Sequence, residues 1–81
     1  MHVTIRFFSS FKDLAGCAQS VETLPDRSTL GALHTTLVAR FPRLAALRQS
    51  TRLAVGVAYQ PPDYVLQDGD EVSLFPPVQG G

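Results

Sequence analysis

Only one segment of this 81-residue chain has a clear helical pattern. Its apolar residues recur at the spacing of a single helix face: Leu30, Leu33, Leu37 and Phe41. Ser28 or Thr29 can cap its start with a side-chain oxygen, and Pro42 ends it because proline lacks the N–H of a helix interior. Gly31 lies off the apolar face. A chain with one main helix must bury that face against other elements, and the flanking segments have the patterns of strands.

The segment before the helix is predicted to contain two strands. Residues 2–8 carry apolar side chains at every second position, and these are expected to face the core: Val3, Ile5 and Phe7. A short helical turn is predicted over residues 9–14, with Gly16 as its stop. Residues 17–24 are predicted to form a second strand, whose weak pattern does not define the inward side.

The segment after the helix is predicted to supply the rest of the sheet. Residues 43–50 are expected to be a loop with a short helical turn, and residues 53–59 a third strand. One side of that strand is apolar, with Leu53, Val55, Val57 and Tyr59, and the other is nearly flat, with Ala54, Gly56 and Ala58. A turn at 68–70 precedes the last strand, residues 71–75. This order predicts an α+β fold, a mixed four- to five-stranded sheet packed on one main helix.

Composition limits the classes of function. Seven Lys and Arg balance seven Asp and Glu without a cluster of either sign, which argues against a nucleic-acid partner. A single cysteine cannot form an internal disulfide, in keeping with a reducing compartment. No stretch is apolar for long enough to span a bilayer, and no secretory signal is evident. We therefore expect one small domain, residues 1–75, in the cytoplasm, with neither nucleic acid nor membrane among its partners.

The last six residues are expected to leave the domain as a tail: Pro76, Pro77, Val78, Gln79, Gly80 and Gly81. The two prolines cannot continue a strand or a helix, so they give the tail a stiff beginning. The two glycines carry no side chain, so the end of the chain can pass through a narrow channel. Fully extended, the tail would reach about 20 Å beyond Phe75, far enough to enter the active site of a partner.

The tail and the residues before it resemble a known family. The run Leu74-Phe75-Pro76-Pro77-Val78-Gln79-Gly80-Gly81, preceded by Asp68-Gly69-Asp70-Glu71-Val72, is similar to the small subunit of molybdopterin synthase. These subunits are the MoaD-type sulfur carriers of the ubiquitin-like β-grasp superfamily. The opening Arg6-Phe7-Phe8, the stretch Phe11-Lys12-Asp13-Leu14-Ala15-Gly16 and the chain length agree. One departure is Ala54-Val55-Gly56, where such chains often have Ala-Val-Asn, and it concerns local contacts at the partner surface.

The resemblance implies a role in sulfur transfer. A ubiquitin-activating-type enzyme would adenylate Gly81 with ATP, and a sulfur donor protein would convert the adenylate into a thiocarboxylate. The carrier would then deliver sulfur to cyclic pyranopterin monophosphate in the molybdopterin synthase large subunit, within a heterotetramer of two small and two large subunits. The chemistry is thus assigned to Gly81, with Gly80 beside it. The resemblance implies that this chain binds no cofactor and no metal of its own.

Strand alternation adds an expectation about the partner surface. In a β-grasp the first and last strands run parallel at the centre of the sheet. By alternation, Phe8 and Phe75 both point away from the helix at the ends of those strands, so we expect them to be neighbours beside the tail. The flat side of the third strand is expected to flank them. An exposed aromatic pair is typical of a docking surface, and we predict that it binds a partner together with residues 76–79.

The other polar residues do not suggest a site. Cys17 has no base positioned beside it and is expected to be a half-buried thiol. His2 and His34 have no companion at metal-ligand spacing, and both are expected at the surface. The acidic run at 68–71 is expected to be a solvated hairpin turn, because it is too short for a calcium loop. No phosphate-binding loop or catalytic-triad signature is present.

Three other functions share these features. A sulfur carrier for thiamine or cysteine synthesis would have the same fold and the same Gly-Gly end. A ubiquitin-like modifier would be activated in the same way and then joined through Gly81 to lysines of other proteins. A plain binding module with an inert tail is the third alternative. A β-grasp ferredoxin is excluded, because an iron–sulfur cluster needs about four cysteines and this chain has one.

Overall fold

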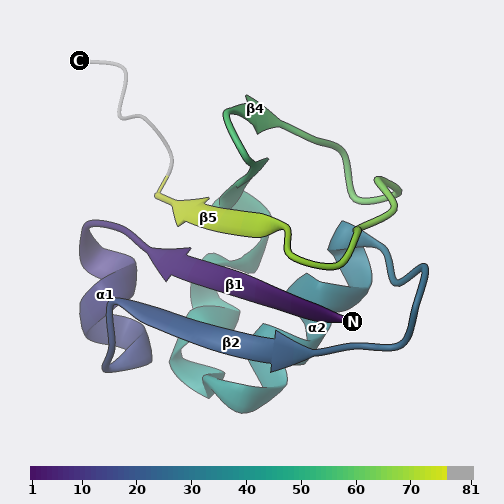
Figure 1. Ribbon diagram of the computed structural model, residues 1–81. Helices are drawn as coiled ribbons and strands as arrows, with labels where there is room; N and C mark the ends of the chain where they lie inside the picture. Colours follow the sequence, from purple (N-terminus) through teal and green to yellow (C-terminus); the bar gives the residue numbers. More distant parts are fainter. Residues whose placement is uncertain (77–81) are drawn as a thin grey trace.

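A five-stranded mixed sheet is the centre of the fold (Figure 1). The computed structural model describes residues 1–76. Its elements are β1 (His2–Phe7), α1 (Ser10–Ala15), β2 (Gln19–Thr23), α2 (Leu30–Arg40), the 3₁₀ helix η1 (Pro42–Ser50), β3 (Arg52–Val55), β4 (Ala58–Tyr59) and β5 (Glu71–Phe75). The strand order is β2-β1-β5-β3-β4. The predicted α+β fold, with a β-grasp order of elements around one main helix, is confirmed.

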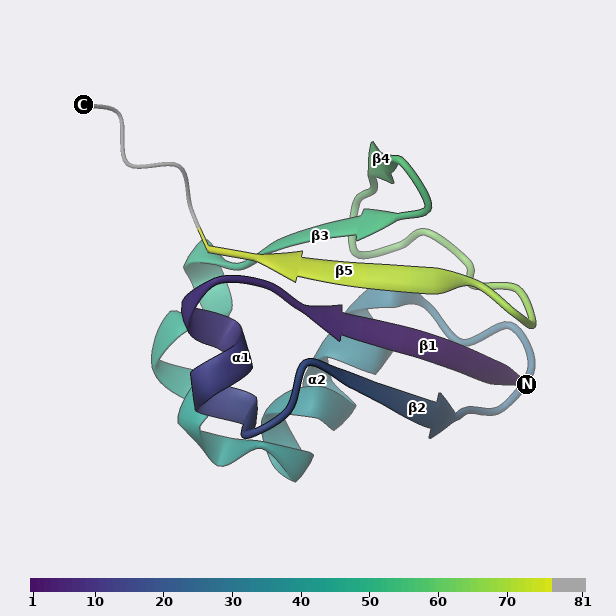
Figure 2. The same ribbon diagram turned by 60° about the vertical axis from the view of Figure 1, so that its left-hand side comes forward.

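The two central strands, β1 and β5, run parallel, as predicted, and end at the same edge of the sheet (Figure 2). Their register pairs Thr4 with Glu71 and Phe7 with Leu74. Strand alternation places every second side chain on the inner face, and those residues are buried: Val3, Ile5, Phe7, Val72 and Leu74. The opposite alternation directs the remaining side chains of both strands to the outer face.

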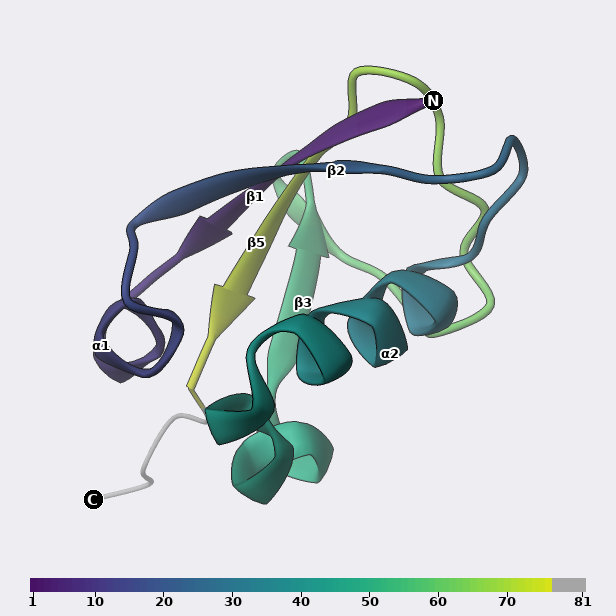
Figure 3. The ribbon, with the colours of Figure 1, turned by 90° about the horizontal axis from the view of Figure 1, so that it is seen from below.

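The inner face of the sheet is covered by α2 and η1, which both lie on one side of it (Figure 3). Thr29 caps α2, because its Oγ1 accepts a hydrogen bond from the N–H of Ala32 at 3.1 Å. Three residues of the apolar face predicted from the sequence are buried in the core: Leu30, Leu33 and Leu37. The fourth, Phe41, follows the end of α2 and is partly buried against the core. None of the helices within residues 1–76 is long and apolar enough to cross a membrane.

Gly31 allows the connection between β4 and β5 to cross close to α2. Its N–H donates to the carbonyl of Pro62 at 2.8 Å. A Cβ at position 31 would lie 3.2 Å from both the Cβ and the carbonyl oxygen of Pro62, which is tighter than ordinary van der Waals contact. The helix-weakening glycine is therefore explained by this close packing, which the position of Gly31 off the apolar face did not indicate.

The predicted third strand, residues 53–59, is wrong as a single element. It is a hairpin of β3 and β4, joined by a turn at Gly56 and Val57. Gly56 has φ 61° and Val57 has a negative φ, as in a type II′ turn, which favours glycine at its first central position. The turn reverses the chain, so Tyr59 pairs with Ala54 and lies on the outer face, not the core face. Of the small residues expected beside the aromatic pair, only Ala54 is on the outer face.

The second strand is shorter than predicted, and its weak pattern has a structural cause. Its register places Ser20 and Glu22 opposite Ile5 and Val3, so two polar residues occupy inward positions. Glu22 is only 4% exposed, and its Oε2 lies 3.0 Å from Nη1 of Arg40 on α2. Nη1 of Arg40 also donates a hydrogen bond to Oε1 of Glu22 at 3.3 Å, whereas Oε2 of Glu22 and Oγ of Ser20 have no hydrogen-bond partner among the described residues. The charge of Arg40 therefore compensates the buried carboxylate in part, and the strand can face the core without apolar alternation.

The prediction that His34 lies at the surface is wrong, because the residue is buried. It follows Leu33 on α2 and is 8% exposed, and its Nε2 has no hydrogen-bond partner among the described residues. Burial lowers the pKa of His34 below the ordinary value of 6.5, and the positive charge of Arg48 on η1 lowers it further. His2, by contrast, is exposed as predicted.

This burial predicts a pH-dependent stability. Below pH 6.5 the unfolded chain binds a proton at His34 more readily than the folded chain, so the free energy of unfolding should fall as the pH falls through 6.5. Thermal unfolding followed between pH 5 and 8 measures this slope. We expect His34→Leu to flatten it, with His2→Gln as the control variant. An unchanged slope in His34→Leu would assign the acid sensitivity to other groups.

The remaining turns differ from the predictions in one respect. Gly16 ends α1 in the left-handed conformation, as predicted, and Cys17 is half-buried, as predicted. The acidic turn at 68–70 is not a hairpin, because it leads into β5, whose neighbours are β1 and β3. Its Asp68 carboxylate accepts a hydrogen bond from the N–H of His2 at 2.8 Å and so ties the turn to the start of β1.

Candidate partner-binding surface

Phe8 and Phe75 form a stacked pair on the outer face of the sheet. Their ring centroids are 4.8 Å apart and their planes differ by 12°. Phe8 follows the end of β1, and Phe75 ends β5, so the parallel register brings the two side chains together. Phe8 is 38% exposed, and Phe75 is half-buried. The prediction that these residues are neighbours on the outer face is confirmed, whereas their predicted role in partner binding stays a prediction.

Tyr59 extends the pair to a third aromatic side chain, which the sequence patterns did not reveal. Its ring meets that of Phe75 edge-on, with centroids 6.2 Å apart, and it is 59% exposed. The guanidinium of Arg52 lies over the Tyr59 ring at 5.8 Å. The available signal was Gly56 inside a strand-like pattern, because such a glycine often marks a turn that changes the side each residue faces. We call Phe8, Tyr59 and Phe75 the aromatic surface.

Phe8 and Phe75 lie at the edge of the sheet where β1 and β5 both end (Figure 2). Phe75 is the last residue of β5, and Pro76, which follows it, is half-buried. The other predicted site residues lie outside the described residues: Pro77, Val78, Gln79, Gly80 and Gly81. A partner that binds the aromatic surface is therefore held beside the start of the predicted tail.

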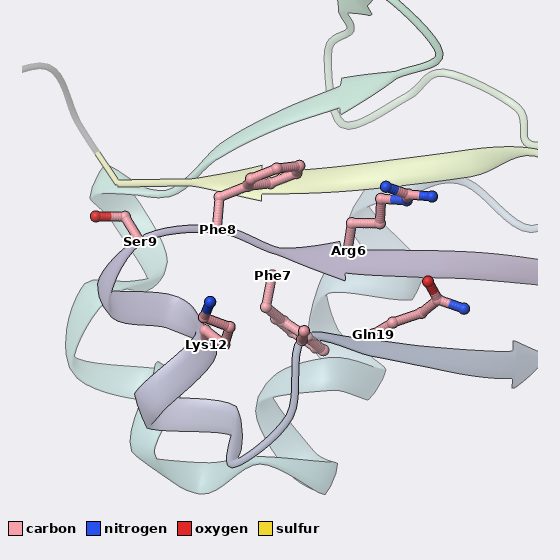
Figure 4. Close-up of a pocket in the computed structure, with 7 residues that line it drawn as sticks. Arg6, Phe7, Phe8, Ser9, Lys12 and Gln19 are labelled. Atoms are coloured by element: carbon pink, nitrogen blue, oxygen red, sulfur yellow. The ribbon is translucent and has the colours of Figure 1, made fainter.

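Charged side chains border the aromatic surface. Nε of Arg6 lies 3.2 Å from Oε1 of Glu71, and both side chains are about half exposed. Beside Arg6 is a small pocket of about 220 Å³ between the end of β1, the first turn of α1 and the start of β2 (Figure 4). The pocket is lined by Arg6, Phe7, Phe8, Ser9, Lys12, Ala18 and Gln19.

This arrangement has the residue types of a surface that binds a protein. Exposed aromatic rings beside arginine are the residue types enriched at protein interfaces. In the part of the chain that the structure describes, no three metal-ligating side chains gather at one place. The predicted absence of a bound cofactor remains an expectation.

Comparison with known protein families shows to which family the chain belongs. Residues 5–81 match the ThiS family, which covers nearly the whole chain and includes the Gly-Gly end. The chain belongs to the ThiS family. Its resemblance to molybdopterin synthase small subunits is also confirmed, because the "Molybdopterin synthase sulfur carrier subunit" of Escherichia coli (strain K12) is 35% identical over 81 residues. That alignment covers 98% of this chain and 99% of the relative.

Two further relatives of this ThiS-family chain show the breadth of the group. "Small archaeal modifier protein 3" of Haloferax volcanii is 30% identical, with complete coverage of both chains. A solved structure described as molybdopterin converting factor, subunit 1, of Pyrococcus furiosus has a TM-score of 0.89 and 27% identity. It covers 96% of this chain and 99% of its own. The β-grasp fold is therefore shared with the solved converting-factor subunit, and the sequence relatives include one named as a sulfur carrier and one named as a modifier.

Proposed function

We propose that the chain is the sulfur-carrier subunit of a molybdopterin synthase and that its reactive group is the carboxylate of Gly81. The observation that carries this proposal is the aromatic surface beside the start of the tail, in a chain related over its whole length to synthase sulfur-carrier subunits. The folded domain docks the partner, and the tail brings the chain end to the chemistry. Molybdenum cofactor biosynthesis is the pathway that this role serves.

The first step must activate the chain end, because a free carboxylate is a poor electrophile. The Gly81 carboxylate attacks the α-phosphate of ATP on a ubiquitin-activating-type enzyme, and pyrophosphate leaves. The terminal sulfur of a donor-protein persulfide then attacks the acyl carbon and displaces AMP. Cleavage of the resulting S–S bond by a second thiol leaves a thiocarboxylate on Gly81 and a disulfide on the donor. ATP is thus bound by the activating enzyme and not by this chain.

The second step delivers the sulfur. The tail enters the large synthase subunit, which holds cyclic pyranopterin monophosphate. The thiocarboxylate sulfur attacks a carbon of the substrate and displaces an oxygen substituent from it, which leaves a thioester between Gly81 and the substrate. Water then hydrolyses the acyl–sulfur bond, so the sulfur stays on the substrate and the Gly81 carboxylate is restored. Two deliveries from two carriers build the dithiolene of molybdopterin, in line with a heterotetramer of two small and two large subunits. Glycine at positions 80 and 81 lets the chain end fit both active sites, since any Cβ adds width to the tail.

A second candidate function is protein modification. It is favoured by the relative named as a small archaeal modifier protein, which shares the whole length of the chain. The activation step is common to both functions, and only the nucleophile that attacks activated Gly81 differs. It is a lysine amine in protein modification and a persulfide in sulfur transfer.

Mass spectrometry of the activated chain separates the two functions. The purified chain is incubated with its activating enzyme, ATP and a persulfide donor. We expect the mass increase that corresponds to the replacement of one oxygen by sulfur at Gly81. A chain that acquires no sulfur, yet is found joined to lysines of other proteins in its native host, would support modification instead.

A further inference from the structure

We propose that the pocket beside the aromatic surface receives an acidic side chain of the large synthase subunit, held by Lys12 with Arg6 and Gln19. The proposal rests on the proposed function, because it names the chemistry that the partner must present at the docking surface. The aromatic surface explains how a partner is held to the sheet. The pocket would fix how that partner is oriented on it.

The first support is the set of donors around the pocket. Arg6 and Gln19 are directly opposite each other on β1 and β2, and Lys12 lines the other side of the pocket from α1 (Figure 4). The lysine ammonium, the guanidinium and the side-chain amide all supply N–H donors, which is the chemistry that a carboxylate needs. Ser9, in the exposed turn between β1 and α1, also lines the pocket.

The second support is the ion pairing of the two basic side chains, Lys12 and Arg6. Lys12 is exposed and forms no ion pair among residues 1–76, whereas Arg6 is paired through Nε with Glu71. A guanidinium has five N–H donors, so Arg6 can keep this pair and still bind a second carboxylate. The pocket therefore has unused donor capacity while the chain is free.

The third support is the distribution of charge. The whole chain has seven basic and seven acidic residues, but the border of the aromatic surface is unbalanced. Arg6, Lys12 and Arg52 lie there with Glu71 as the acidic member. Asp13, which follows Lys12 on α1, is also exposed, so the excess of positive charge is small. A partner surface complementary to the basic side chains is expected to carry acidic residues. The pocket is also continuous with the aromatic surface, because Phe8 lines both.

The test is the affinity for the purified large subunit, measured by calorimetry at several salt concentrations. We expect Lys12→Ala to weaken binding about threefold and Lys12→Glu at least about tenfold, since an exposed ion pair contributes little and a like-charge contact costs more. The salt dependence of the affinity should be smaller for Lys12→Ala than for the native chain. Arg27→Glu is the matched control, with the same charge change on the loop between β2 and α2, at the opposite end of β1 (Figure 1).

Carbodiimide cross-linking then identifies the occupant, because it joins an amine directly to a carboxylate in contact with it. We expect Lys12 to be linked to one Asp or Glu of the large subunit, and we expect substitution of that residue by Lys to restore binding to Lys12→Glu. Binding that is equally insensitive to Lys12→Glu and Arg27→Glu would overturn the pocket proposal and leave the proposed function standing. A native chain that does not bind the large subunit at all would overturn the proposed function, and the pocket proposal with it.

Discussion

Gly81→Ala is expected to abolish sulfur transfer without unfolding the domain. The substitution places a methyl group on the Cα next to the reacting carboxyl carbon. Both the activating enzyme and the synthase must admit the chain end at this position. Because small misplacements at a reacting centre cost about a hundredfold in rate, we expect thiocarboxylate formation to be at least that much slower. Mass spectrometry after incubation with the activating enzyme, ATP and a persulfide donor measures the rate.

The folded domain supplies the control for this experiment. Residues 1–76 contain the core, so the unfolding midpoint of Gly81→Ala should equal that of the native chain. Its affinity for the large subunit should also fall much less than its rate of sulfur loading. Native rates of sulfur loading and transfer in Gly81→Ala would show that the chain end is not the reactive group.

Phe75→Ser is expected to cause the second large effect, a loss of partner binding. Phe75 contacts both other members of the aromatic surface, Phe8 and Tyr59, so its removal disrupts the whole surface. Aromatic residues at the centre of an interface commonly contribute 2 kcal/mol or more, and we therefore expect the affinity for the large subunit to fall about 30-fold or more. Calorimetric titration of the variant with the purified subunit measures this.

Stability and a matched variant separate the binding role of Phe75 from a role in the core. The stacked pair contributes about 1 kcal/mol to folding, so Phe75→Ser should lower the unfolding midpoint by several degrees and leave a folded protein. Val21→Ser changes an exposed apolar side chain on the same face of the sheet, two strands away on β2, and should bind normally. Global unfolding of Phe75→Ser would place this residue in the core, and native affinity would remove it from the interface.

Much of the fold follows from alternation and helical spacing alone. The buried face of α2 and the inner face of β1 were both predicted, because each has its apolar residues at one regular interval. The same alternation predicted that Phe8 and Phe75 share the outer face. Their contact required one further fact, the parallel pairing of β1 and β5, which the resemblance to the β-grasp supplied.

Each failed prediction has an identifiable physical cause. The hairpin at Gly56 was missed because the apolar alternation continues across the turn from Val55 to Tyr59. Tyr59 was therefore assigned to the core face and not to the aromatic surface. His34 was assigned to the surface because helical spacing alone does not show that η1 packs against that side of α2. The inward side of the second strand could not be predicted, because the buried Glu22 is paired with Arg40, which is far away in sequence. The cases of His34 and Glu22 depend on tertiary contacts that a local pattern does not contain, whereas Gly56 was a local signal of the hairpin.

The central claim is that the Gly-Gly end of this chain supplies sulfur for molybdopterin. The most direct test is the molybdenum-cofactor content of the native host after deletion of the codons for Gly80 and Gly81, with the intact gene restored as the control. The account predicts loss of the cofactor, without a new requirement for thiamine or cysteine. Normal cofactor content in the deletion strain would contradict it, and an accompanying requirement for thiamine or cysteine would assign the carrier to that pathway instead.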